Sequence, residues 1–130
     1  MSEPKKTTIK KHTDLEVYQK AFAAAMRMFE LSKSFPVEER YSLTDQVRRS
    51  SRSVSANLAE AWRKRRYRAH WISKLSDSEA EAAETQTWIQ FAVECNYLNR
   101  ETGVQIYKEY DSILGMLVTM MNRPEVWCIG

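Results

Sequence analysis

The longest stretch of the sequence without either of the two strongest turn-forming residues runs from Val37 to Thr102 and reads VEERYSLTDQVRRSSRSVSANLAEAWRKRRYRAHWISKLSDSEAEAAETQTWIQFAVECNYLNRET. It contains neither glycine nor proline. A β-sandwich or barrel would need turn residues roughly every 8–12 positions. An α/β nucleotide fold would need a glycine-rich phosphate loop. Because the whole chain of 130 residues holds only 3 Gly and 3 Pro, we expect an all-α fold.

Prolines mark two of the expected helix ends, since proline pushes the preceding residue out of the helical region. These ends are Phe35-Pro36 and Arg123-Pro124. Apolar residues spaced at i, i+3 and i+4 then divide the chain further. The expected helices span about 14–34, 43–65, 70–97 and 101–122, inside one domain of 13–123 with a flexible basic tail at 1–12 and a C-terminal tail at 124–130. Four such helices with short links predict an antiparallel up-down-up-down four-helix bundle.

The first and fourth helices each carry two apolar stripes, and on the third helix Trp88, Phe91 and Cys95 lie away from the face that carries Leu75 and Val93. The stripes that we expect in the core hold Leu15, Tyr18, Phe22, Ala25, Met26 and Phe29, and Tyr107, Tyr110, Leu114, Leu117, Val118 and Met121. A four-helix monomer has no layer left to cover a second stripe, and large apolar patches mark interaction sites. The sequence therefore predicts a homo-oligomer with an interface at Val17, Ala24, Met28, Leu31, Trp88, Phe91, Ile106, Ile113, Met116 and Met120. The alternative is that each helix buries a broad stripe within one subunit.

The patterns of common catalytic and metal sites are missing. A di-iron bundle needs Glu-x-x-His pairs, but Tyr67 precedes His70 and Ile9 precedes His12 at that spacing. No Gly-x-Ser-x-Gly nucleophile elbow occurs. We therefore expect no enzyme, no metal, no cofactor and no small-molecule substrate. No apolar run approaches the roughly 20 residues of a membrane span, and the N-terminus lacks a signal-like stretch, so we expect a cytoplasmic protein without a membrane partner.

Positive charge gathers near the end of the second helix, where residues 63–68 read RKRRYR. Side chains of this kind can neutralise the phosphates of RNA or DNA. The candidate nucleic-acid-binding residues are Arg48, Arg49, Arg52, Arg63, Lys64, Arg65, Arg66 and Arg68. Tyr67 and Trp71 are placed to stack on unpaired bases. The alternative is a solvated surface, with Arg49 and Arg52 paired to Glu81 and Glu84 in an antiparallel hairpin.

Several segments together resemble one known family. They are Phe35-Pro36, Glu38–Leu43 (EERYSL), Gln46–Ser50 (QVRRS), Ser53–Glu60 (SVSANLAE), Glu84–Gln86 (ETQ), Cys95–Leu98 (CNYL) and Asn122–Glu125 (NRPE). From about Leu15 to Trp127 the chain resembles the bacterial four-helix bundle proteins encoded by intervening sequences within 23S ribosomal RNA genes. It departs from them at Ser55, where the family often has Pro, and at Ala61, where it often has Gly.

The resemblance implies a small antiparallel bundle, a homopentamer and no established catalytic residue. The genomic setting of the family implies association with nucleic acid. Its characteristic polar residues correspond to Asn57, Glu60, Glu84 and Thr85. We expect a structural role: Asn57 bonded to an adjacent helix or loop, and Glu60 paired with a cation across the bundle or a subunit boundary. Ligand binding by these residues is the alternative.

Two functions from different classes follow. The first is a non-enzymatic homo-oligomeric bundle that binds RNA or DNA phosphates through the basic face of the second helix. The second is a protein-interaction or scaffold module with no nucleic-acid role, whose basic face is only a solvated surface. A third hypothesis is an enzyme or small-ligand binder that uses the bundle interior.

Overall fold

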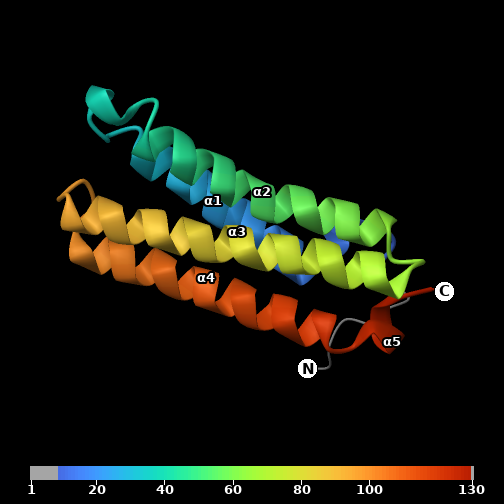
Figure 1. Cartoon of the computed structure of the whole chain (residues 1–130). Coiled ribbons are helices and arrows are strands. Elements are labelled where there is room, and N and C mark those ends of the chain that lie inside the picture. The colour runs from blue at the N-terminus through green and yellow to red at the C-terminus, as the bar shows by residue number, and fades with distance from the viewer. Residues whose placement is uncertain (1–8, 130) are drawn as a thin grey trace.

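The computed structural model describes residues 9–129, and four long helices dominate this part of the chain (Figure 1). These helices are α1 (Glu16–Ser32), α2 (Leu43–Arg63), α3 (Arg68–Glu94) and α4 (Arg100–Met121). Shorter elements are the 3₁₀ turns η2 (His12–Asp14) and η3 (Val37–Glu39) and the helix α5 (Pro124–Trp127). No strand occurs between residues 9 and 129, so the fold is all-α, as the sequence predicts.

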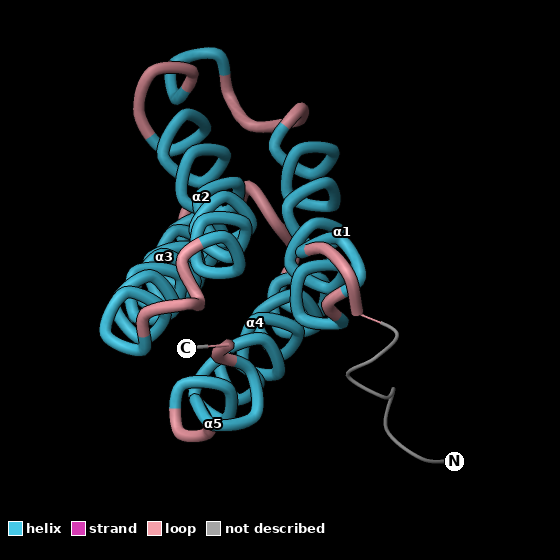
Figure 2. The backbone as a smooth tube through the Cα atoms, turned by 90° about the vertical axis from the view of Figure 1, so that its right-hand side faces the viewer, coloured by secondary structure: helices cyan, strands magenta, loops and turns pink. Residues whose placement is uncertain are grey.

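Each long helix packs against two others, and α1 and α3 lie on opposite sides with α2 and α4 between them (Figure 2). The hydroxyls of Ser50 and Thr85 lie 2.8 Å apart, whereas Glu60 near the end of α2 meets Lys74 near the start of α3 at 3.0 Å. Residue numbers therefore rise along α2 as they fall along α3. The turn between these helices and α5 lie at the same end of the molecule (Figure 1).

The core face of α1 is only partly the one that the sequence predicts, since Leu15 and Ala25 are buried as predicted. Val17, Ala24 and Met28 are 1% exposed or less, whereas Phe22 is 52% and Met26 47% exposed. Alanine lets a neighbouring helix approach closely, so the narrow alanine face turns inward. The larger side chains then remain at the edge, because close packing rather than residue size decides the core.

On α4 the predicted core residues Tyr110 and Leu117 are buried, but Ile106, Ile113 and Met120 are buried as well, while Val118 is 38% exposed. Much of the predicted oligomer interface is therefore wrong. The residues of that prediction that lie in the core of the subunit itself are Val17, Ala24, Met28, Ile106, Ile113 and Met120. Leu31, Trp88 and Met116 are half-buried against that core. Only Phe91, which is 54% exposed, stands well clear of it.

The segment predicted to be a C-terminal tail is instead a short helix. Pro124 opens α5 in its first turn, where a missing N–H costs nothing. The ring of Trp127 stacks on that of Trp71 from α3, with centroids 6.3 Å apart. Residues 1–8 of the predicted N-terminal tail lie outside the described part, and His12 belongs to η2. No helix between residues 9 and 129 is both long and apolar enough to cross a bilayer.

Candidate nucleic-acid interface

The basic segment forms a tight turn that needs no glycine. At the end of α2 the backbone N–H of Lys64 donates to the carbonyls of Glu60 and Ala61. The N–H of Tyr67 donates to the Lys64 carbonyl over 3.1 Å, and Tyr67 then caps α3 in an extended conformation. The C-terminal segment holds the turn from outside, since the N–H of Ile129 donates to the Arg65 carbonyl over 3.4 Å.

Four cations project from this turn, and we call them the basic turn: Arg63, Lys64, Arg66 and Arg68. All four are exposed. Within residues 9–129 none of them takes part in an ion pair. Burial and, second, the neighbouring Arg63 lower the pKa of Arg65. The turn therefore concentrates uncompensated positive charge at one end of the bundle.

The other predicted phosphate-binding cations do not join the basic turn as free side chains. Arg48 donates through Nε to Ser32 Oγ over 2.8 Å and lies over the Phe29 ring, as does Arg52. The guanidinium of Arg65 lies 3.7 Å from the centre of the Trp62 ring and donates to the Trp62 carbonyl. Along the predicted basic face of α2, Arg48, Arg52 and Arg65 therefore lie against aromatic rings of their own subunit, and of these three only Arg52 is exposed.

Arg49 is the remaining member of the predicted set. It lies 4.0 Å from Asp45, one turn earlier in α2, and both side chains are exposed. The predicted pairing across the hairpin is limited to a long-range attraction, in which Arg49 lowers the pKa of Glu81. Burial, followed by Glu84 and Asp77, raises that pKa more strongly. Arg49 thus belongs to a mixed-charge surface and not to the basic turn.

Of the two aromatic residues predicted to stack on bases, one is buried and the other is exposed. Trp71 is fully buried and is not available to a ligand. Tyr67 is 58% exposed, and its ring meets that of His70 edge-on with centroids 5.3 Å apart. Trp71 lies on the apolar stripe of its own helix, and its stacking partner Trp127 comes from the C-terminal segment predicted to be a tail.

The polar residues of the family motif bond to groups of their own subunit, and only Thr85 of the four is buried. Glu60 pairs with Lys74 of α3 at 3.0 Å and raises the pKa of that lysine. Asn57 Nδ2 donates to the Ser53 carbonyl of its own helix, so the expected bond to another element is absent. Thr85 is buried and shares a hydrogen bond with Ser50, while Glu84 accepts one from Trp88 Nε1 at 3.4 Å.

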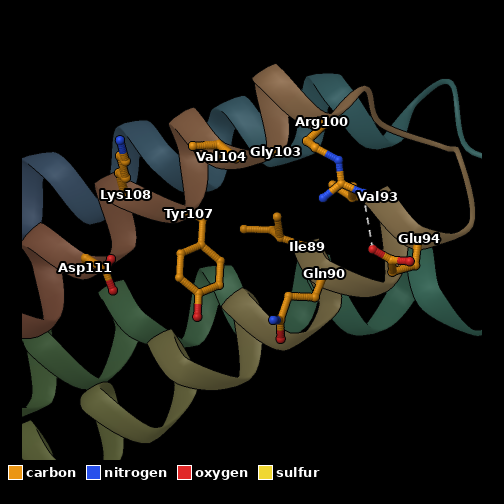
Figure 3. A pocket seen from close by; sticks show the side chains of 10 residues that line it. All are labelled: Ile89, Gln90, Val93, Glu94, Arg100, Gly103, Val104, Tyr107, Lys108 and Asp111. Carbon is orange, nitrogen blue, oxygen red and sulfur yellow. Dashed lines mark hydrogen bonds and ion pairs between the residues drawn. The ribbon is translucent and has the colours of Figure 1, made fainter.

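A groove of about 350 Å³ lies between α3 and α4 (Figure 3). Its lining residues are Ile89, Gln90, Val93, Glu94, Arg100, Gly103, Val104, Tyr107, Lys108 and Asp111. A methyl group added at Gly103 would collide with Val93, so glycine is needed for the close approach of the two helices. Arg100 closes one end on Glu94 at 3.5 Å. Between residues 9 and 129 no three His, Cys, Asp or Glu side chains are grouped to hold a metal ion.

The chain is similar to a known protein family and to solved structures. Residues 13–119 match the family model described as 23S rRNA-intervening sequence protein. The chain is also similar to a protein of unknown function of the S23 ribosomal protein family from Bacteroides thetaiotaomicron, whose crystal structure is known. The identity is 29%, the TM-score is 0.74, and the match covers 82% of this chain and 95% of that one. No curated protein matches.

The family match spans α1, α2, the basic turn, α3 and α4 as far as residue 119. The similar crystal structure supports the same helical fold over nearly its full length. The chain therefore belongs to the family of 23S rRNA-intervening sequence proteins.

Proposed function

We propose that this protein is a non-enzymatic, antiparallel up-down-up-down helical bundle that binds the phosphates of RNA or DNA through the basic turn. The observation that carries the proposal is the exposure of Arg63, Lys64, Arg66 and Arg68 without an ion-pair partner in the described chain. Each such side chain that meets a phosphate releases condensed counterions, which favours binding at low salt.

The distribution of charge supports binding over a merely solvated surface. The formal net charge of the chain is only +3, so its average field is weak. The basic turn places four of the cations within the span 63–68, and such a local excess directs an anionic ligand to one end of the molecule.

The test is fluorescence anisotropy with labelled RNA and DNA of 20 nucleotides across a salt series. We expect log Kd to change linearly with log salt, and we expect affinity to vanish when Arg63, Lys64, Arg66 and Arg68 are changed to Glu. The matched control changes Lys20, Arg40, Arg100 and Lys108 to Glu, which alters the net charge equally elsewhere on the surface. Equal loss in both variants, or no binding by the parent protein, would contradict the proposal.

We also propose that copies of the chain associate, through a surface different from the predicted one. The large apolar side chains exposed on α1 are Phe22 and Met26, and on α3 Phe91 is exposed beside the half-buried Trp88. The Trp88 and Phe91 rings lie 6.0 Å apart. Two unlike apolar patches on opposite helices suit a head-to-tail contact, which closes into a ring when the rotation between copies allows it. The homopentamer implied by the family resemblance is such a ring.

A further inference from the structure

Tyr67 stands in the middle of the basic turn, directly between Arg66 and Arg68. Its ring is 58% exposed although the turn around it is well held. The Tyr67 N–H is bonded to Lys64, and the Tyr67 ring meets His70. Four residues further on, Trp71 is fully buried and stacked on Trp127. An aromatic ring is therefore presented to solvent from an anchored position between two free cations.

This combination suits one form of nucleic acid better than another. Proteins that bind single strands pair cations for the backbone with aromatic rings on which unpaired bases stack. In a duplex the bases are already stacked on one another, and double-stranded RNA is recognised mainly by its shape, phosphates and 2′-hydroxyls. An exposed tyrosine contributes to the first kind of binding and not to the second.

We propose that the basic turn takes an unpaired strand of nucleic acid, with one base stacked on Tyr67 and adjacent phosphates on Arg66 and Arg68. The proposal rests on the proposed function, because the phosphates must bind before a base can stack. An acidic peptide is the competing occupant, since it also satisfies the cations, but it carries no base for the ring.

The experiment compares three labelled probes with the full chain: a 12-nucleotide oligouridine, a blunt 12-base-pair RNA duplex and polyglutamate of matched charge. The variants are Tyr67→Ala and Tyr67→Phe. The control is Tyr41→Ala, which removes an exposed ring at the opposite end of α2 from the basic turn. We expect Tyr67→Ala to weaken oligouridine binding by about 5-fold or more, the lower end of the effect of one stacked base. Tyr67→Phe and Tyr41→Ala should bind as the parent does, and duplex affinity should not respond to Tyr67→Ala.

A second readout does not depend on affinity. Oligouridine carrying 5-iodouridine should crosslink on irradiation to the peptide that contains Tyr67, as mapped by mass spectrometry. If oligouridine and duplex bind alike and neither responds to Tyr67→Ala, the inference fails while the proposed function stands. If polyglutamate binds as tightly as oligouridine, the occupant is an acidic chain and the inference also fails. Absence of nucleic-acid binding altogether would overturn the proposed function first.

Discussion

The hydroxyl of Thr85 shows how the bundle accommodates a polar side chain at its centre. Thr85 is fully buried, donates to the Glu81 carbonyl over 2.9 Å and shares a hydrogen bond with Ser50 of α2. Buried polar groups are stable when each has a partner. The family motif marks Thr85 as characteristic, but the identity of its partner depends on the packing of α2 against α3.

Thr85→Val should lower the free energy of unfolding by about 1–3 kcal/mol, because Ser50 loses its partner on α3 while the side-chain shape is kept. Urea denaturation followed by circular dichroism measures this change. The matched control is Thr87→Val, since Thr87 is exposed and bonds only to Ala83 of its own helix. A loss of the same size in both variants would show that the interhelical hydrogen bond is unimportant.

The contact between Tyr97 and Glu39 contributes stability that is lost both at acid pH and at alkaline pH. Tyr97 Oη donates to Glu39 Oε2 over 2.9 Å, which lowers the pKa of Glu39 and raises the pKa of Tyr97 to about 12. The carboxylate contributes stability above its unfolded pKa, and this is lost as pH falls through the lower folded value. The phenol contributes stability below its unfolded pKa, and this is lost as pH rises toward 12.

The Tm advantage of the parent over Tyr97→Phe should therefore be largest between about pH 5 and pH 9, where the phenol is protonated and the carboxylate ionised. Thermal melts of both proteins from pH 3 to pH 11 measure it. The Tm advantage should shrink on the acid side as Glu39 becomes protonated, and on the alkaline side as the pH rises toward the pKa of Tyr97. A Tm difference that stays constant across the whole range would refute this explanation.

Among the elements, α5 has the role least visible in the sequence. Its four residues are too few to form a stable helix alone, so its stability comes from packing on the rest of the chain. Trp127 covers Trp71, and the segment after it bonds to the carbonyl of Arg65. The C-terminal segment thus supports the turn that carries the proposed interface.

Trp127→Ala should reduce stability by about 1–3 kcal/mol, less than the 3–5 kcal/mol of a fully buried tryptophan, because Trp127 is only half-buried. Denaturant titration measures the loss, and faster amide exchange at residues 64–68 should accompany it. Ile129→Ala is the control, since that side chain is 67% exposed and its N–H is retained. Unchanged exchange in the turn would show that α5 does not support it.

For the whole molecule, core and surface substitutions on neighbouring apolar residues should have different consequences. Ile113 is fully buried, so Ile113→Lys places a charge in the core and should abolish cooperative folding. Circular dichroism and thermal melts check this outcome. If the Ile113→Lys protein instead folds and its subunit number changes, the result would support the interface predicted from the sequence.

Association should depend on the exposed patches. Phe22→Glu or Phe91→Glu should leave the helical content unchanged and lower the mass measured by light scattering, because each removes one side of the head-to-tail contact. Tyr41→Glu, at a side chain that is 86% exposed on a different segment, is the control. A monomeric parent protein at micromolar concentration would contradict the proposed association.

The all-α class and the approximate helix ranges could be predicted because they rest on local chemistry. The glycine- and proline-free stretch from Val37 to Thr102 permits long helices, and prolines at 36 and 124 limit their ends. The run RKRRYR identified the basic turn for the same reason, since a cluster of adjacent charges is visible without knowledge of the packing.

The choice of core face depended on contacts between distant segments. Residues around Ala24 and residues around Phe22 form two apolar stripes on α1, and the helical period alone does not rank them. The close approach of neighbouring helices to the alanine side buried Val17, Ala24 and Met28. Of the other stripe it left Phe22 and Met26 exposed, while Leu15 and Ala25 are buried. Trp71 likewise stacks on Trp127, and the carbonyl of Arg65 accepts from the N–H of Ile129, both partners lying more than fifty residues later in the chain. Helix formation is local, whereas the side of a helix that water reaches is decided by what packs against it.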